Sequence, residues 1–179
     1  GMSGGRKSAP SAVGRTSSGV KAAGLAAGKG VWVCHTAAGR GVGRRAAGAL
    51  GQPCHVEELL EGKEISLFAL CNGTSAVTLP AVQDYKRIGE GDSGPNTGGM
   101  GAHSPSGLLS ADDAAALLEK VVRPTIAGLK EENRPFVGVI YAGLMMTSDG
   151  PKVLEFNVRR GDPEAQPLLL RMEDDRLQR

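Results

Sequence analysis

The sequence predicts an α+β fold with mainly antiparallel sheets and flanking helices. Strand-like segments joined by short turns occupy residues 64–83 and 136–159, and a helical pattern lies between them near residues 110–122. Aromatic residues make up only 3% of the chain, so the core must be built from aliphatic side chains and methionine. With 179 residues, the chain is long enough to bury such a core in one domain.

Composition divides the chain into three zones. Residues 1–19 are rich in Gly, Ser, Ala and Arg, which predicts a flexible tail. Residues 20–55 are glycine-rich and basic, with one apolar stretch at residues 31–33. Residues 56–179 have the composition of an ordinary folded domain, and no internal repeat is visible. We therefore expect the regular structure to be concentrated in the third zone.

The folded domain begins with two predicted strands and a turn. Residues 64–71 and 76–83 are strand-like, and Asn72 with Gly73 supplies the positive-φ positions of a hairpin turn. The segment that follows, residues 89–101, is so rich in glycine that we expect a loop there.

A capped helix and a second pair of strands complete the prediction. Ser110 and Asp113 have the spacing of a capping box. Apolar residues at helical spacing follow at 117, 118, 121 and 122, and Pro124 is expected to kink or interrupt the helix. Residues 136–146 predict a strand that is buried on both faces, residues 149–150 a turn, and residues 152–159 a final strand.

The composition also limits the classes of function. The chain has three cysteines without a CxxC spacing and three scattered histidines, so neither a zinc site nor a disulfide framework is expected. It has no run of 18 apolar residues, so we expect no membrane partner. The cysteine usage and the lack of a signal-like apolar stretch near the N-terminus predict a cytoplasmic location. Residues 1–56 carry eight Lys or Arg and no acid, which leaves a nucleic-acid-binding segment, a transit peptide or an unstructured tail open. Because Trp32 is the only aromatic residue in this part of the sequence, we expect no nucleic-acid partner.

The final predicted strand carries the strongest chemical signal. Side chains alternate between the two faces of a strand, so Glu155, Asn157 and Arg159 should share one face while Leu154, Phe156 and Val158 face the core. Mg²⁺ prefers carboxylate and carbonyl oxygens, and a guanidinium can neutralise a phosphoryl group beside the metal. A solvated strand face with an incidental ion pair is the alternative. Asp162 and Glu164 follow directly, and this density of acceptor groups favours a metal–phosphate site.

Two glycine-rich segments carry weaker signals. Residues 21–30 combine glycines with two lysines, a composition suited to anions, but the glycine spacing does not match a P-loop. Taken alone, this segment is better explained as a Gly/Ala linker. Residues 92–101 could wrap a small polar ligand or form a structural turn, and the polar cluster at residues 83–87 lies just before them.

Taken in order, five segments resemble glycinamide ribonucleotide synthetases, an ATP-grasp family. These segments are KAAGLAAGKGV, VEELLEGKE, QDYKRIGEGDSGPNTGGMGAHSP, GVIYAGLMM and VLEFNVRRGDPEAQP. The resemblance implies an ATP-grasp domain with an incomplete N-terminal lobe. It also implies the ligation of glycine to 5-phosphoribosylamine, with cleavage of ATP to ADP and phosphate, in a monomer that uses Mg²⁺ or Mn²⁺.

The resemblance further assigns roles to individual residues. Glu155 and Asn157 match metal ligands, and Arg159 and Asp162 match residues near the reacting phosphoryl group. Residues that match ATP contacts are Lys21, Gly24, Gly28, Lys29, Gly30, Glu57, Glu58, Leu59 and Glu64. Residues that match substrate contacts are Asp84, Lys86, Pro95, Asn96, Thr97, Gly98 and Gly99.

The chain also departs from the family pattern. Ala23 stands where the family has an acidic residue, Arg160 where it has an aromatic one, Tyr85 where it has histidine and His103 where it has tyrosine. A basic Gly/Ala/Arg stretch replaces an acidic helix between residues 31 and 56. One hypothesis covers these departures: a truncated or partly frame-shifted gene product, which would bind Mg-nucleotide weakly and be catalytically impaired.

Overall fold

The computed structural model describes residues 17–23, 30–49, 51 and 53–172. Its contacts divide the chain into two compact units, Gly1–Leu60 and Glu61–Arg179. Among the described residues no helix is long and apolar enough to cross a membrane.

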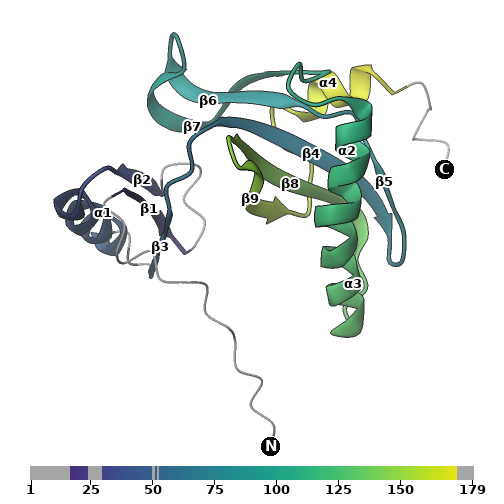
Figure 1. Cartoon of the computed structure of the whole chain (residues 1–179), viewed down its shortest axis with the longest axis horizontal. Helices are drawn as coiled ribbons and strands as arrows, with labels where there is room; N and C mark the ends of the chain where they lie inside the picture. The colour runs from purple at the N-terminus through teal and green to yellow at the C-terminus, as the bar shows by residue number, and fades with distance from the viewer. Residues whose placement is uncertain (1–16, 24–29, 50, 52, 173–179) are drawn as a thin grey trace, which may run out of the picture. The chain divides into compact units, whose positions relative to one another are not determined.

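The first unit is a three-stranded antiparallel sheet packed against one helix (Figure 1). Strands β1 (Ser18–Ala22), β2 (Val31–Cys34) and β3 (Cys54–Glu58) are arranged in the order β2-β1-β3, and α1 spans Ala37–Ala49. Val20, Cys34 and Ala47 form its buried centre. The unit is more regular than the sequence suggested. The stretch 37–49 contains five alanines, which favour a helix, and β1 begins inside the segment expected to be a tail.

The second unit is built on a four-stranded antiparallel sheet in the order β5-β4-β8-β9. Its strands are β4 (Lys63–Asn72), β5 (Ala76–Thr78), β8 (Val137–Thr147) and β9 (Gly150–Asn157). The long pairing of β4 with β8 runs from Lys63↔Met146 to Asn72↔Val137. The prediction of a buried strand at residues 136–146 is confirmed, because Ile140–Leu144 at the centre of β8 are all buried.

Two adjacent helices and a π-helical turn form a continuous helical segment of the second unit. It consists of α2 (Ala111–Leu117), the π-helical turn η2 (Leu118–Val122) and α3 (Arg123–Glu131). The predicted capping box is confirmed: Ser110 Oγ accepts from the Asp113 backbone N–H at 3.1 Å, and the Asp113 carboxylate accepts from the Ser110 N–H at 3.2 Å. Pro124 lies in the first turn of α3, directly after the π-helical turn, so the regular α-helix is interrupted at this proline, as expected, although the chain stays helical through it.

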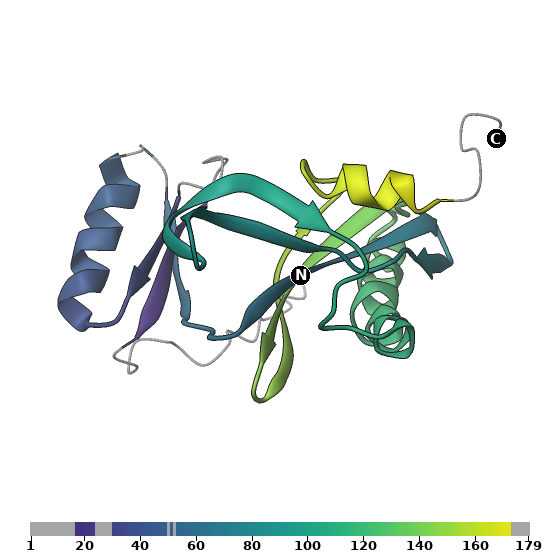
Figure 2. The ribbon, with the colours of Figure 1, turned by 90° about the horizontal axis from the view of Figure 1, so that it is seen from above.

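Alternation along β4 and β8 gives the four-stranded sheet two different faces. Leu67, Ala69 and Ile140 belong to a core that α2, η2 and α3 complete with Leu117, Val122 and Ile126 among others. Phe68 and Tyr141 belong to the opposite face, where Leu168 of α4 (Ala165–Leu170) covers them. Figures 1 and 2 show α2–α3 on one side of the sheet and α4 on the other.

Residues 76–83, expected to form one strand, are divided in the structure. Strand β5 ends at Thr78, and β6 (Gln83–Gly89) starts five residues later. Pro80 lies between them and, with no N–H, cannot continue a hydrogen-bonded ladder. Val82 instead forms a single bridge to Ser66 of β4, which brings the start of β6 to that sheet.

The loop expected at residues 89–101 is largely a strand, and this prediction was wrong. Strand β7 (Ser93–His103) pairs with β6 in an antiparallel hairpin from Gln83↔His103 to Gly89↔Ser93. A ladder uses backbone groups, so glycine-rich segments can form one where tertiary pairing compensates for their low propensity. Two register shifts around Arg87 accommodate the irregular backbone, and Thr97 Oγ1 donates to the Lys86 carbonyl at 2.7 Å within this irregular stretch.

Candidate functional site

A polar surface lies on the face of the four-stranded sheet that is turned away from α2 and α3. Cross-strand register defines it in two rows. One row is Ser66–Gly143–Glu155 and the next is Phe68–Tyr141–Asn157, each running from β4 through β8 to β9. Because neighbouring residues in a strand alternate faces, the members of both rows point to the same side. This register brings Glu155 and Asn157 together, as the sequence predicted.

The apolar half of the prediction for the last strand was wrong. Phe156 is 42% exposed and Val158 is 69% exposed, so neither is a core residue in this structure. A register shift between Gly143↔Glu155 and Leu144↔Val153 leaves Leu154 as the extra residue of a bulge. The bulge interrupts strict alternation along β9, but it lies before Glu155 and leaves the Glu155–Asn157 spacing intact.

Arg159 and Asp162 lie beyond the end of β9 and are exposed. The Arg159 guanidinium donates to the Arg160 carbonyl at 3.1 Å. Asp162 Oδ1 accepts from the Gln166 side chain at 2.9 Å. Arg159 is therefore on a loop, and not on the strand face that alternation predicted.

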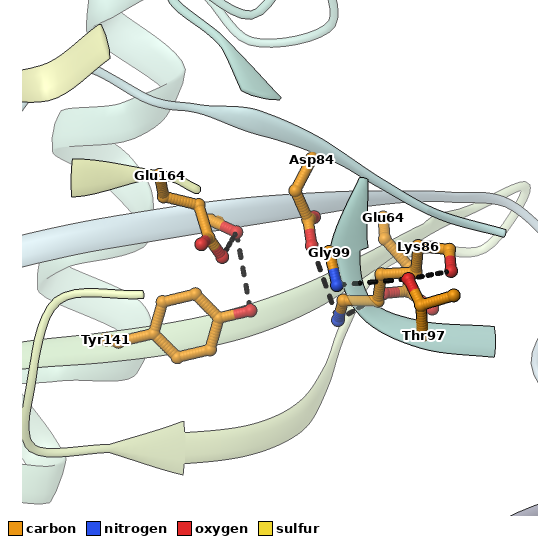
Figure 3. Close-up of polar contacts among 8 residues, drawn as sticks. Glu64, Asp84, Lys86, Thr97, Gly99, Tyr141 and Glu164 are labelled. Carbon is orange, nitrogen blue, oxygen red and sulfur yellow. Dashed lines mark hydrogen bonds and ion pairs between the residues drawn. The ribbon is translucent and has the colours of Figure 1, made fainter. Parts of the chain in front are cut away.

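An ion cluster joins β4 to the β6–β7 hairpin (Figure 3). Lys86 Nζ lies 2.7 Å from Glu64 Oε2 and 3.8 Å from Asp84 Oδ2. The Asp84 side chain is only 2% exposed. Among the described residues its Oδ1 has no hydrogen-bond partner. The cluster thus brings together three residues to which the family resemblance gave ATP and substrate contacts.

Burial controls the electrostatics of this cluster. It raises the pKa of the Asp84 carboxyl from 3.8 to about 6; Lys86 opposes the rise, and Glu164 and Glu64 add to it. Burial lowers the pKa of Lys86, but the anionic forms of Tyr141, Glu64 and Asp84 together outweigh it and leave that pKa above its ordinary value. Lys86 therefore remains charged at neutral pH, whereas Asp84 changes charge close to it.

The hairpin places the predicted substrate residues against the loop that carries Asp162. Thr97 and Asn96 are half-buried, and Thr97 Oγ1 accepts from the Gly99 N–H at 3.1 Å. A Cβ built on Gly99 would lie 2.4 Å from Pro163 Cδ and 3.1 Å from the Asp162 carbonyl oxygen. Only glycine permits this approach, so Gly99 and Asp162 are brought together. Pro95 and Gly98 are exposed on the same strand.

Three buried polar residues next to these groups were not predicted as site residues. Ser66, Tyr141 and Glu164 are 0%, 5% and 5% exposed and are linked through Ser66 Oγ (Figure 3 shows Tyr141 and Glu164). Ser66 interrupts an otherwise apolar strand, a pattern that could have identified it. Glu164 was noted only as one of several acceptor groups.

The nucleotide-contact candidates of the first unit lie on and beside its sheet. Lys21 on β1 is paired in register with Val31 and His55. Gly30 accepts from the Ala22 N–H at 2.8 Å through its carbonyl. Glu57 and Glu58 are exposed at the end of β3, and Leu59 follows the strand. Gly24, Gly28 and Lys29 lie outside the described residues.

The oxygen donors on β9 meet part of what a divalent cation requires. Glu155 and Asn157 offer a carboxylate and an amide oxygen from one strand face, which suits Mg²⁺ when phosphates complete its shell. Within the described ranges no group of three or more His, Cys, Asp or Glu side chains has the arrangement of a metal site. The residues therefore fit a cation shared with a phosphate ligand, and not an ion held by protein alone.

Comparison with known proteins gives three findings. The model of the phosphoribosylglycinamide synthetase ATP-grasp (A) domain matches residues 7–165. Phosphoribosylamine–glycine ligase of Rhodopirellula baltica is 51% identical over 162 residues, which cover 87% of this chain and 37% of that protein. The crystal structure of phosphoribosylamine–glycine ligase from Thermotoga maritima has a TM-score of 0.74 at 36% identity, over 86% of this chain and 40% of that one.

A structure with much lower sequence identity has a similar fold. The biotin carboxylase domain of 2-oxoglutarate carboxylase from Hydrogenobacter thermophilus, solved with MgADP and bicarbonate, has a TM-score of 0.63. It is 17% identical and covers 83% of this chain and 32% of that one. At this identity the likeness concerns the fold alone.

Proposed function

Because the chain belongs to the phosphoribosylglycinamide synthetase family through its ATP-grasp (A) domain, we propose that it binds Mg·ATP in the ligation of glycine to 5-phosphoribosylamine. The products are glycinamide ribonucleotide, ADP and phosphate. The chain spans 37% of the length of the Rhodopirellula relative. Ligation is accordingly proposed for the whole protein, and binding of the magnesium–nucleotide complex for the residues present here.

The cross-strand register of β4, β8 and β9 supports this proposal. The two cross-strand rows place Glu155 and Asn157 on one face of the sheet, the face that also bears Tyr141 and the β4 residue Ser66. Glu64, two residues before Ser66 and therefore on the same face, is joined by ion pairing to Lys86. Acceptor oxygens for a cation and a lysine for an anion thus border one surface, as a metal–phosphate ligand requires.

Different residues of the chain would have different roles in phosphoryl transfer. Glu155 and Asn157 would hold Mg²⁺, which when bound would neutralise charge on the phosphate oxygens. Arg159, exposed on its loop, can place a permanent positive charge beside a phosphoryl group. Lys86, kept charged by its acidic neighbours, can attract an anionic group. No side-chain nucleophile is needed, because this chemistry depends on positioning and charge neutralisation.

Calorimetry with Mg·ADP tests the proposed metal ligands. Replacing Glu155 by Ala removes the only charged oxygen of the proposed pair and should weaken binding at least tenfold, or about 1.4 kcal/mol. Glu131→Ala is the matched control, because Glu131 is an exposed glutamate at the end of α3. Equal affinities for the unmodified chain and Glu155→Ala would refute the assignment of Glu155.

A further inference from the structure

A buried network of polar side chains lies next to the proposed magnesium ligands. Ser66 Oγ is 3.3 Å from the Tyr141 hydroxyl and 3.4 Å from Glu164 Oε1. The three residues come from β4, from β8 and from the segment that enters α4. We call them the Ser66 network. Burying polar groups is unfavourable unless they are hydrogen-bonded, so a set of three in one place calls for an explanation.

The chemistry of the three groups gives the network a direction. A carboxylate accepts hydrogen bonds, and a serine has one proton to donate. Both bonds are used when Ser66 donates to Glu164 and Tyr141 donates to Ser66. The Tyr141 ring is also packed against Phe68, with ring centroids 5.0 Å apart. Tyr141 is thus fixed at both its ring and its hydroxyl.

Gly143 connects the Ser66 network to Glu155. In the register, Gly143 lies between Ser66 on β4 and Glu155 on β9. A Cβ built on Gly143 would be 3.2 Å from the Tyr141 hydroxyl oxygen and 3.3 Å from Glu155 Cγ. These contacts are tighter than ordinary van der Waals distances. The Tyr141 hydroxyl and the Glu155 side chain therefore both lie against the Cβ position of Gly143, on the same face of the sheet.

We propose that the Ser66 network positions Glu155 for metal binding, with the Tyr141 hydroxyl as the group that borders the Glu155 side chain over Gly143. Tyr141 is then a positioning residue that need not touch the metal. A flexible glutamate would otherwise lose side-chain entropy when it binds a cation. Fixing it beforehand removes part of that cost, and outer groups around metal ligands commonly have this effect. The metal part of this inference rests on the proposed function.

Glu164 extends the same network to the loop that carries Asp162. The Ala165 N–H donates to the Gly161 carbonyl at 2.9 Å, and the Gln166 side chain donates to Asp162 Oδ1 at 2.9 Å. Both bonds lie within the turn that Glu164 anchors to Ser66. The network thus joins the Asp162 loop to one buried hydroxyl on β4, in the same cross-strand row as Glu155.

The first test needs neither metal nor nucleotide. Side-chain couplings of Glu155, measured by NMR in the ligand-free chain, should report one rotamer in the unmodified protein and averaged rotamers in Tyr141→Phe and in Ser66→Ala. Tyr85→Phe is the matched control: it removes the same hydroxyl from the other tyrosine, which is 48% exposed on the hairpin. A single Glu155 rotamer in both network variants would overturn the proposal.

The second test measures Mn²⁺ binding in the presence of ADP by electron paramagnetic resonance. Tyr141→Phe should weaken Mn²⁺ binding by about 10- to 100-fold, the usual range for outer groups of metal sites. The loss of Mn²⁺ affinity in the double variant Ser66→Ala/Tyr141→Phe should be smaller than the sum of the losses in the two single variants, because both substitutions break the same chain of hydrogen bonds. A loss of stability in Tyr141→Phe with unchanged Mn²⁺ affinity would show a merely structural role.

The two tests separate the positioning inference from the proposed function. If the unmodified chain binds no Mn²⁺ with ADP, the proposed function fails, and the rotamer measurement still decides whether the network positions Glu155. If Mn²⁺ binds but Tyr141→Phe changes neither the rotamer nor the affinity, the proposed function stands and the positioning inference is wrong.

Discussion

Replacing Asp84 by Asn should stabilise the protein, and the gain should depend on pH. The Asp84 carboxyl is buried, its Oδ1 lacks a hydrogen-bond partner among the described residues, and its pKa is raised from 3.8 to about 6. The folded protein therefore binds this proton more tightly than the unfolded chain does. The contribution of protonated Asp84 to the free energy of unfolding is then fully present below pH 3.8 and is lost as the pH rises through about 6.

The size of the effect follows from the two pKa values. One pKa unit corresponds to about 1.36 kcal/mol, so a rise from 3.8 to about 6 gives a cost of about 3 kcal/mol for ionised Asp84 above pH 7. Asn has the shape of the neutral acid and does not titrate. The gain from Asp84→Asn in the free energy of unfolding should thus be about 3 kcal/mol larger at pH 8 than at pH 3.

Urea unfolding followed by circular dichroism between pH 3 and pH 8 is the assay. Asp92→Asn is the matched control, because Asp92 is an exposed aspartate at the tip of the same hairpin. Its effect on the free energy of unfolding should be the same at both pH values within about 0.5 kcal/mol. A gain for Asp84→Asn that does not grow with pH would refute the argument that Asp84 is buried at a cost.

Three further predictions concern the same unit. Lys86→Met should raise the Asp84 pKa above about 6 in an NMR titration, since Lys86 lowers it; an unchanged midpoint would contradict the ion cluster. Gly99→Ala should lower the free energy of unfolding by about 1–3 kcal/mol, because the new Cβ would lie 2.4 Å from Pro163 Cδ. Gly98→Ala is the control, since a Cβ at that position would meet no atom within 4 Å. Ser110→Ala should cost about 1 kcal/mol through loss of the α2 cap, and an unchanged urea midpoint would show that the cap is unimportant.

Local signals allowed much of the fold to be predicted. The cap at Ser110 and the strand around Ile140 depend on neighbouring residues, and both are confirmed. Strand β7 was missed because its glycines carry no periodic signal, and only pairing with β6 shows it to be a strand. Helix α1 was missed for a similar reason, because its alanines favour a helix while its glycines disfavour one.

The candidate site was predictable where its residues are neighbours in the sequence. The Glu155–Asn157 pair follows from alternation on one strand, and the register confirms that the two residues share a face. The bulge at Leu154 and the exposure of Phe156 depend on the pairing partner, so alternation alone gave the wrong core face. The Ser66 network joins residues separated by 75 and 98 positions, a distance at which no sequence pattern links them.

Locating bound Mn²⁺ by NMR tests directly whether Glu155 and Asn157 hold the cation. Mn²⁺ added with ADP broadens the amide signals of residues close to the ion. We expect the signals of Gly143, Glu155 and Asn157 to broaden most in the presence of ADP, and those of α3 on the opposite face of the sheet to broaden less. Broadening centred away from β8 and β9, or no broadening at any ADP concentration, would contradict this expectation.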